Sequence, residues 1–296
     1  MSATPSSVFD QRLSSPTATS ISPATEGSKR ISVAALIAIV IIIVLVVLIV
    51  LGSVMAATVS RVTRNARLEN IPLAERQTCK HSRIIPQDRV ATSKLPPGIS
   101  RAVLSNSPIV DALHGMLTSA QCRHLIAVAT PRFKRSVVVD ATTGKSVENV
   151  DRTSSSVFLE RNETPTIVSI QAHASKAAGM PESHLERLQV VRYYPGQFYK
   201  PHYDYLENST EDVLQHGQRV ITVFVYLNDL RDEETGGGTR FPHLDLVVRP
   251  EEGKAALWHD VTSSGNVDPR TLHGGDPLKT SVKYGLNCWW RDRPQV

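Results

Sequence analysis

An uncharged run near the N-terminus constrains this chain more than any other feature. Residues 31–60 contain no Asp, Glu, Lys or Arg, and Val33 to Ala57 consists mainly of Ile, Val, Leu and Ala. A helix of this length crosses roughly 30 Å of hydrocarbon. Because a cleavable signal peptide has a shorter apolar core nearer the N-terminus, the run predicts a single uncleaved transmembrane signal-anchor helix over residues 31–58.

The predicted span divides the chain into three further parts. Residues 1–30 are rich in Ser, Thr, Pro and Ala, and they bury too little apolar surface to offset the entropy of ordering, so we expect a disordered tail. Residues 59–100 carry scattered basic residues and prolines without an apolar period, which predicts a stem or linker. The pattern of a globular domain occupies residues 101–296.

The basic charge of the chain does not belong to the predicted domain. The formal net charge is +5, but residues 101–296 hold 22 Lys and Arg against 23 Asp and Glu. A nucleic-acid-binding surface on the domain is therefore disfavoured. Cys79, Cys122 and Cys288 are too few and too scattered for a disulfide scaffold or a zinc knuckle, so at most one bridge can form.

Two signals disagree about the orientation of the predicted span. Lys29 and Arg30 precede it and three arginines follow it by residue 67, so the positive-inside count places the C-terminus in the cytosol. Two sequons, at Asn162 and Asn208, are glycosylation candidates only if the domain is lumenal. The residues alone leave the orientation open.

Helical and strand patterns predict an α+β domain. Thr118 begins a capping box ahead of a helix at about residues 119–129, and Thr164 with Pro165 opens a second helix that stops at Gly179. Short strands after helices favour a double-stranded β-helix (jelly-roll) core braced by the N-terminal helices. The predicted strands are Leu188–Tyr194, Arg219–Leu227, Leu244–Val248, Ala255–Trp258 and Tyr284–Trp290.

Three separated residues have the types of a metal-binding triad. His202 and Asp204 lie two positions apart on an extended segment and so point to the same side, and His273 is a distant second imidazole. Two histidines and one carboxylate form the facial triad that leaves open positions on non-haem Fe(II). An isolated His-x-Asp triplet is weak support, because most such triplets are surface residues.

Lys283 adds a second requirement to the predicted site. It lies ten residues after His273, at the start of a predicted strand rich in aromatic residues. An unpaired ammonium inside a barrel is costly, so it needs an anionic partner. A small dicarboxylate fits, with one end on the metal and the other on Lys283. The alternative is a lysine that extends to the surface.

Several motifs in one order resemble a known enzyme family. The segments R-Y-Y-P-G-Q-F-Y-K-P-H-Y-D-Y, Q-R-V-I-T-V-F-V-Y-L-N-D-L, G-G-G-T-R-F-P and D-P-R-T-L-H-G-G-D-P-L, with Lys283 and Trp289, are similar to the catalytic domain of plant and algal prolyl 4-hydroxylases. These are Fe(II)- and 2-oxoglutarate-dependent dioxygenases. The resemblance extends from about residue 101 to the C-terminus.

The resemblance implies a role for individual residues. It assigns iron to the triad and the distal carboxylate of 2-oxoglutarate to Lys283. Tyr193, Thr239 and Trp289 match positions that line the cosubstrate pocket, and Arg152, Ser154, Glu186 and Tyr199 match positions near the peptide groove.

Each of the pocket and groove assignments has a plainer alternative. Without the resemblance, Tyr193 and Trp289 are equally well core aromatics, and Thr239 favours a strand after a glycine turn. Arg152 and Glu186 are then surface charges.

Two positions depart from the family pattern. The family often has Cys where Asp276 stands and Gly where Ser281 stands. Neither is a predicted ligand, so only the local turn, and any disulfide that uses the cysteine, are affected.

The implied function is that of a membrane-anchored prolyl 4-hydroxylase of the procollagen-proline 4-dioxygenase type. It would convert peptidyl proline to 4-hydroxyproline while 2-oxoglutarate and O2 yield succinate and CO2, with L-ascorbate rescuing oxidised iron. The implied substrates are proline-rich secretory or cell-wall proteins, and the implied location is the endoplasmic reticulum or Golgi membrane, type II, with the domain lumenal.

Three other functions remain open at this point. One is another 2-oxoglutarate-dependent peptidyl hydroxylase, such as a lysyl hydroxylase. Another is a catalytically silent, membrane-tethered peptide-binding module, which an intact triad and Lys283 disfavour. A zinc hydrolase with the same ligands lacks an evident general base at a fixed spacing.

Overall fold

The computed structural model describes residues 41–47, 83–139, 146–208, 210–230 and 236–295. The predicted tail, and most of the predicted span and stem, therefore lie outside the described residues. Residues 41–47 are helical. Within the described ranges, none of the helices combines the length and the apolar character needed to cross a bilayer. The chain divides into two compact units, Met1–Arg76 and Gln77–Val296, and the second holds the elements described below.

An eight-stranded sheet forms the main layer of the second unit, and every pairing within it is antiparallel. Its central strands β9 and β14 are the longest, with eight and nine residues. In spatial order the strands are β1 (Ser100–Asn106), β2 (Ile109–His114), β12 (Ala255–His259), β9 (Arg219–Tyr226), β14 (Lys283–Arg291), β7 (Gln189–Tyr193), β6 (Ser155–Phe158) and β3 (Lys134–Arg135).

A four-stranded antiparallel sheet faces the large one. Phe241 on the small sheet packs edge-on against Trp258 on β12, with ring centroids 5.3 Å apart. The predicted α+β fold is therefore confirmed as a combination of helices with antiparallel sheets. The small sheet has the order β11 (Leu246–Val248), β10 (Thr239–Phe241), β13 (His273–Gly275) and β8 (Tyr199–His202), and a separate hairpin joins β4 (Val137–Val139) to β5 (Ser146–Glu148).

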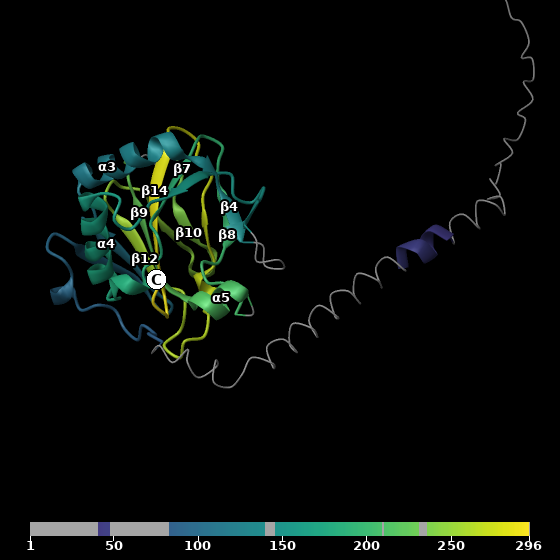
Figure 1. The fold of residues 1–296 in the computed structure, drawn as a ribbon, viewed down its shortest axis with the longest axis horizontal. Coiled ribbons are helices and arrows are strands. Elements are labelled where there is room, and N and C mark those ends of the chain that lie inside the picture. The colour runs from purple at the N-terminus through teal and green to yellow at the C-terminus, as the bar shows by residue number, and fades with distance from the viewer. Residues whose placement is uncertain (1–40, 48–82, 140–145, 209, 231–235, 296) are drawn as a thin grey trace, which may run out of the picture. The chain divides into compact units, whose positions relative to one another are not determined.

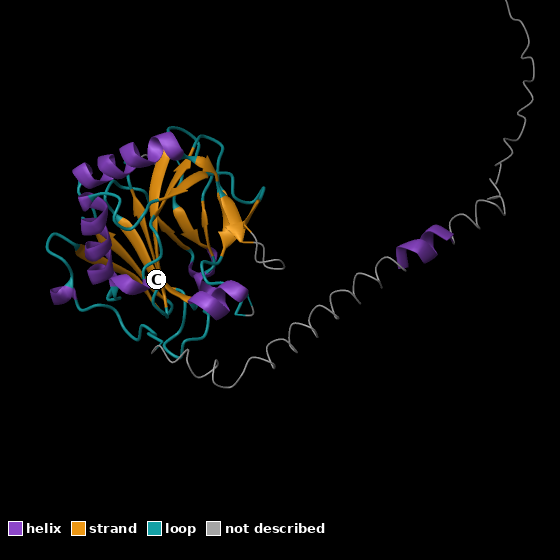
Figure 2. Cartoon of the chain, in the orientation of Figure 1, coloured by secondary structure: helices purple, strands orange, loops and turns teal. Residues whose placement is uncertain are grey.

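Both predicted helices form, and both cover the outer face of the large sheet. Thr118 and Gln121 make the expected capping box at the start of α3 (Ser119–Ala129). The Thr164 hydroxyl accepts from the backbone N–H of Ile167 at the start of α4 (Pro165–Ala178), which ends at a left-handed Gly179. Figures 1 and 2 show these helices on the side of β9 and β14 away from β8 and β10.

Alternation along β14 separates the core from the site. Leu286, Cys288 and Trp290 point toward the helices and belong to the main hydrophobic core. Lys283 and Trp289 point the opposite way, into a cavity between the two sheets. The two-residue period of the strand thus places one set of side chains against α4 and the other set in the cavity. On the α4 side, the Trp290 indole N–H donates to Ser175 Oγ over 3.3 Å.

The folded unit starts earlier than the predicted boundary at residue 101. Residues 83–99 pack along the domain, and Ile85 is partly buried against its core. The Arg83 guanidinium lies 2.5 Å from the Asp292 carboxylate, and Arg89 donates to the buried Asp111 over 2.8 Å. Residues 83–99 of the predicted stem therefore pack on the surface of the domain.

Candidate iron and cosubstrate site

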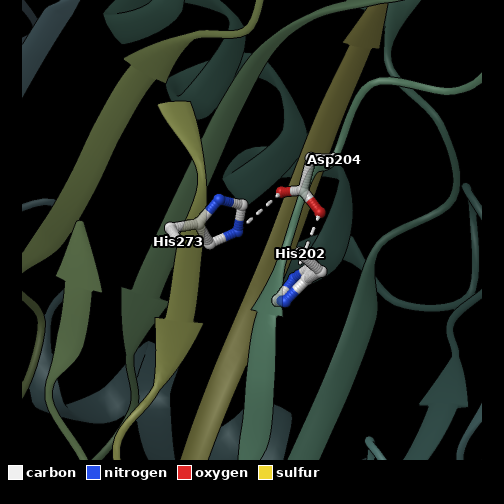
Figure 3. Close-up of side chains that lie close together, drawn as sticks. All are labelled: His202, Asp204 and His273. Atoms are coloured by element: carbon white, nitrogen blue, oxygen red, sulfur yellow. Dashed lines mark ion pairs between the residues drawn. The ribbon is translucent and has the colours of Figure 1, made fainter. Parts of the chain in front are cut away.

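The predicted metal triad converges at one point between the small sheet and the cavity. The antiparallel register of β8 and β13 makes His202 and His273 direct partners, and Asp204 follows two residues after His202. His202 Nε2 lies 3.8 Å from Asp204 Oδ1, and His273 Nε2 lies 3.6 Å from Asp204 Oδ2. Figure 3 shows the three side chains turned toward one another, and one ligand atom from each lies within 4.8 Å of the others.

Backbone carbonyls orient both imidazoles of the triad. His202 Nδ1–H donates to the Lys200 carbonyl over 2.8 Å, and His273 Nδ1–H donates to the Thr271 carbonyl over 3.0 Å. Because a carbonyl only accepts, each neutral ring keeps its Nε2 lone pair for the shared point. Burial and the neighbouring His273 lower the pKa of His202 to about 3, so its ring is neutral at physiological pH.

Asp204 supplies the negative charge of the triad. Burial opposes its ionisation, but the nearby Arg219 guanidinium favours the charged carboxylate, and the pKa of this carboxyl lies below its usual value. Two neutral nitrogens and one carboxylate oxygen are the donor set expected for non-haem iron.

Lys283 lies buried at the deep end of the same cavity, whose volume is about 310 Å³. Its ammonium donates to the Gly237 carbonyl over 2.5 Å and lies 5.0–5.4 Å from the ring centroids of Phe224, Tyr226 and Tyr193. Within the described ranges, no carboxylate forms an ion pair with it. Burial lowers the pKa of Lys283 to about 7. This site is therefore suited to an anionic group from a ligand.

Comparisons with known proteins agree with this chemistry. Residues 188–291 match the model of the 2OG-Fe(II) oxygenase superfamily. Prolyl 4-hydroxylase 1 of Arabidopsis thaliana is 36% identical over 206 residues, which cover 64% of this chain and 71% of that protein. Probable prolyl 4-hydroxylase 10 of the same plant is 36% identical over 208 residues, with the same two coverages.

This chain belongs to the prolyl 4-hydroxylases of the 2OG-Fe(II) oxygenase superfamily. Among solved structures, a viral collagen prolyl hydroxylase from Paramecium Bursaria Chlorella virus-1 has a TM-score of 0.49 and 26% identity, covering 62% of this chain and 95% of that one.

The family implies Fe(II), 2-oxoglutarate and O2, and the residues of this enzyme fit that set. Two free Nε2 lone pairs and a carboxylate face one point, and the same cavity holds a buried ammonium that has no carboxylate partner among the residues that the structure describes.

The three residues expected to line the cosubstrate pocket all reach the cavity wall. Tyr193 is the cross-strand partner of Lys283, and Trp289 lies on the same face of β14. The Tyr226 hydroxyl lies 2.8 Å from the Val248 carbonyl and 2.7 Å from Thr239 Oγ1. The Tyr226 hydroxyl has one proton and donates it to the Val248 carbonyl. The Thr239 hydroxyl must therefore donate to the Tyr226 oxygen, and this bond fixes Thr239 beside the cavity.

Two of the four predicted groove residues also line the cavity. Arg152 is buried, donates to Gln189 Oε1 over 2.9 Å and lies 4.9 Å from the centroid of the Tyr199 ring. Tyr199 in turn stacks on the His202 imidazole with centroids 3.5 Å apart. Both side chains therefore lie beside the triad, where a substrate must approach, and their role in binding it stays a prediction.

The other two predicted groove residues lie behind the wall. Ser154 is fully buried and donates from its hydroxyl to Ser136. The Glu186 carboxylate accepts from Arg219 over 2.8 and 2.9 Å and from Arg291 over 2.6 Å, and these cations lower its pKa against the effect of burial. Glu186 is thus an ion-paired, half-buried carboxylate and not a free surface charge. It lines a second pocket together with Phe158, and its place near the peptide groove stays a prediction.

Sequence patterns did not identify five residues of β7, β9, β12 and β14 that line the cavity. Arg219 is the most notable, because its guanidinium lies 3.9 Å from the centroid of the Trp289 ring and links Glu186 to the cavity. The alternation of side chains along a strand predicts the other four only when it is known which face of the sheet lines the cavity. They are Gln189, Arg219, Phe224, Trp258 and Asn287.

Gly285 makes room for the Phe224 ring between Lys283 and Trp289. A Cβ at Gly285 would lie 2.3 Å from Phe224 Cζ. We expect Gly285→Ala to lower the free energy of unfolding by about 1–3 kcal/mol and to raise the KM for 2-oxoglutarate, because the displaced ring enters the cavity. Thermal unfolding and initial rates measure the two effects. Adding Phe224→Leu should reverse both, and failure of this rescue would contradict the proposed contact.

Proposed function

We propose that this enzyme hydroxylates C4 of peptidyl proline in proline-rich secretory or cell-wall proteins, from a membrane anchor with its catalytic domain in the lumen of the endoplasmic reticulum or Golgi. The observation that carries the catalytic part is the presence of the His202, Asp204 and His273 triad and the buried Lys283 ammonium in one cavity.

Different residues of the cavity are assigned to the metal, the cosubstrate and the exclusion of water. The triad holds Fe(II), and Lys283 pairs with the distal carboxylate of 2-oxoglutarate beside Tyr193 and Thr239. When bound, iron, 2-oxoglutarate and O2 together supply the oxidising equivalent for C4, as 2-oxoglutarate loses CO2 and becomes succinate. The aromatic wall excludes water from the reacting groups. L-Ascorbate would restore Fe(II) after uncoupled turnover.

The mouth of the cavity carries exposed apolar side chains that suit a proline-rich peptide. Val137, Phe158 and Tyr203 line the cavity, yet are 37–38% exposed. A proline-rich segment lacks most backbone N–H donors and holds an extended left-handed helix, so its recognition depends on packing of rings and methylenes. We therefore assign these three residues to the positions flanking the target proline.

Serine substitutions test this assignment against a matched position. Val137→Ser and Phe158→Ser should each raise the KM for a long proline-rich peptide by about 5-fold or more, while the KM for 2-oxoglutarate stays unchanged. Val168→Ser is the control, because Val168 is 41% exposed on α4, away from the cavity. Equal KM values for all three variants would contradict the assignment.

A panel of peptides tests the proposed substrate class. Collagen-like, poly-proline and Ser-Pro-rich peptides are incubated with the enzyme, Fe(II), 2-oxoglutarate and ascorbate, and analysed by mass spectrometry. We expect one added oxygen at proline in the poly-proline or Ser-Pro-rich peptides. Modification at lysine instead would support a different peptidyl hydroxylase.

The lumenal location rests on sequence signals and on the family. Asn162 and Asn208 are both exposed, as glycosylation of either asparagine requires. Expression of the full chain in a secretory cell should give a membrane-bound product whose mass falls on endoglycosidase treatment and on Asn162→Gln with Asn208→Gln. A membrane-bound product without glycans at either sequon would favour the cytosolic orientation that the charge count indicates.

A further inference from the structure

Asp260 is a fully buried carboxylate that belongs to neither the triad nor the predicted pocket. Its Oδ1 accepts from the Trp258 indole N–H over 2.9 Å, and its Oδ2 accepts from the Thr222 hydroxyl over 2.8 Å. Both donors are neutral, and the described residues supply no ion pair to it. Burying a carboxylate without a cationic partner is costly, so packing alone does not account for this residue.

Trp258 connects Asp260 to a metal ligand. Its ring lines the cavity and lies 4.5 Å from the centroid of the His273 imidazole. Phe241 closes the arrangement, at 5.3 Å from Trp258 and 5.6 Å from His273. Apart from the bond from its Nδ1–H to the Thr271 carbonyl, His273 is held on this side by two aromatic rings.

The hydrogen bond to Asp260 fixes how the indole lies in this stack. An indole ring can rotate in a cavity, but a buried N–H must keep its acceptor, which removes that freedom. The register of the sheet adds a second restraint, because Thr222 on β9 is the direct partner of Trp258 on β12. Asp260 therefore ties two neighbouring strands together immediately behind the iron site.

We propose that Asp260 is a positioning residue that fixes the Trp258 indole, and through it the His273 imidazole, in the orientation that binds iron. The assignment rests on the proposed function only for the identity of the metal. Hydrogen bonding, and not charge, is the property required.

Two substitutions at Asp260 separate hydrogen bonding from charge. Asp260→Leu removes both acceptors, and we expect it to weaken Fe(II) binding by about 10–100-fold, as for other partners that orient metal ligands. Asp260→Asn keeps an acceptor for Trp258, and we expect iron affinity close to that of the wild type. Anaerobic equilibrium dialysis measures affinity, and near-ultraviolet circular dichroism of the metal-free protein reports the indole environment.

A second variant of the same hydrogen bond and a control complete the experiment. Trp258→Phe removes the donor of the bond that Asp260→Leu deprives of its acceptor, so it should weaken iron binding by itself, and combining the two substitutions should add little further loss. Asp111→Asn is the control, because Asp111 is equally buried in the same sheet but pairs with Arg89 and Arg101, and it should lower stability without changing iron affinity.

The proposal is overturned if Asp260→Leu binds iron as the wild type does, or if Asp260→Asn is as defective as Asp260→Leu. If the leucine variant does not fold, the asparagine variant and Trp258→Phe still decide the question. Iron affinity is measured without a peptide, so failure of the proposed substrate class would leave this result unaffected.

Discussion

Lys283→Ala should raise the KM for 2-oxoglutarate by about 30- to 5,000-fold, which corresponds to the roughly 2–5 kcal/mol lost when one partner of a buried charge pair is removed. The side chain has no carboxylate partner among the described residues, so the cosubstrate is expected to supply it. Initial rates of succinate formation across 2-oxoglutarate concentrations measure the effect. Lys279→Ala is the control, because Lys279 is exposed four residues away.

The same residue predicts a pH dependence. Burial lowers the pKa of Lys283 to about 7, and only the protonated amine can pair with a carboxylate. The ammonium charge is therefore present below about pH 7. Above that pH, Lys283 must take up a proton when 2-oxoglutarate binds, so the KM for 2-oxoglutarate should rise by at most about tenfold per pH unit. Lys283→Arg keeps its charge throughout and should lose this dependence. A wild-type KM that does not change between pH 6 and 9 would contradict the ion pair.

His273→Ala should abolish hydroxylation by preventing iron binding. We expect the affinity for Fe(II) to fall by more than the approximately 100-fold that marks the loss of a merely supporting partner, with peptide hydroxylation and succinate formation both at background. Metal content after anaerobic reconstitution is the measurement. The matched control is His243→Ala, because His243 is an exposed histidine on a neighbouring turn.

His202→Ala provides an independent check on the same claim. Its ring contributes the second Nε2 and lies across the strand pair from His273, so its loss should have a similar effect. Metal content equal to that of the wild type in either variant would favour a catalytically silent peptide-binding module.

Local chemistry made the two helices predictable from sequence. A capping box at Thr118, and Thr164 followed by proline and closed by Gly179, specify helix ends without reference to the rest of the chain. The apolar runs that became β9 and β14 were also long enough to identify. Strands β8, β10 and β13 have three or four residues, which is too short for an alternating pattern to be recognised.

The metal ligands and Lys283 were predictable because each is a chemically demanding residue in a recognisable motif. The ion pairs of Glu186 and the hydrogen bonds of Asp260 were not predicted, because both depend on partners on other strands. Glu186 meets Arg219 and Arg291, and Asp260 meets Thr222, only after the sheet assembles. Such cross-strand contacts have no signature in the local sequence.

The structure shows the surroundings of the two positions that depart from the family pattern. Asp276 forms a two-point ion pair with Arg240, at 2.9 and 2.8 Å, that joins β13 to β10. Ser281 has a φ of 64°, in the left-handed region where glycine carries no steric cost. Ser281 therefore adopts the left-handed backbone conformation that glycine, the residue often found here in the family, adopts without steric cost.

The coupling of two products tests the central claim most directly. The purified enzyme is incubated with Fe(II), 2-oxoglutarate, O2 and a proline-rich peptide, and succinate and hydroxyproline are quantified together. We predict equal amounts of the two, with the oxygen on C4 of proline. At sub-saturating 2-oxoglutarate, Lys283→Ala should form both products at least about 30-fold more slowly, and His273→Ala should form neither. Succinate without hydroxyproline on any proline-containing peptide, or hydroxyproline that persists when the triad is broken, would contradict the account.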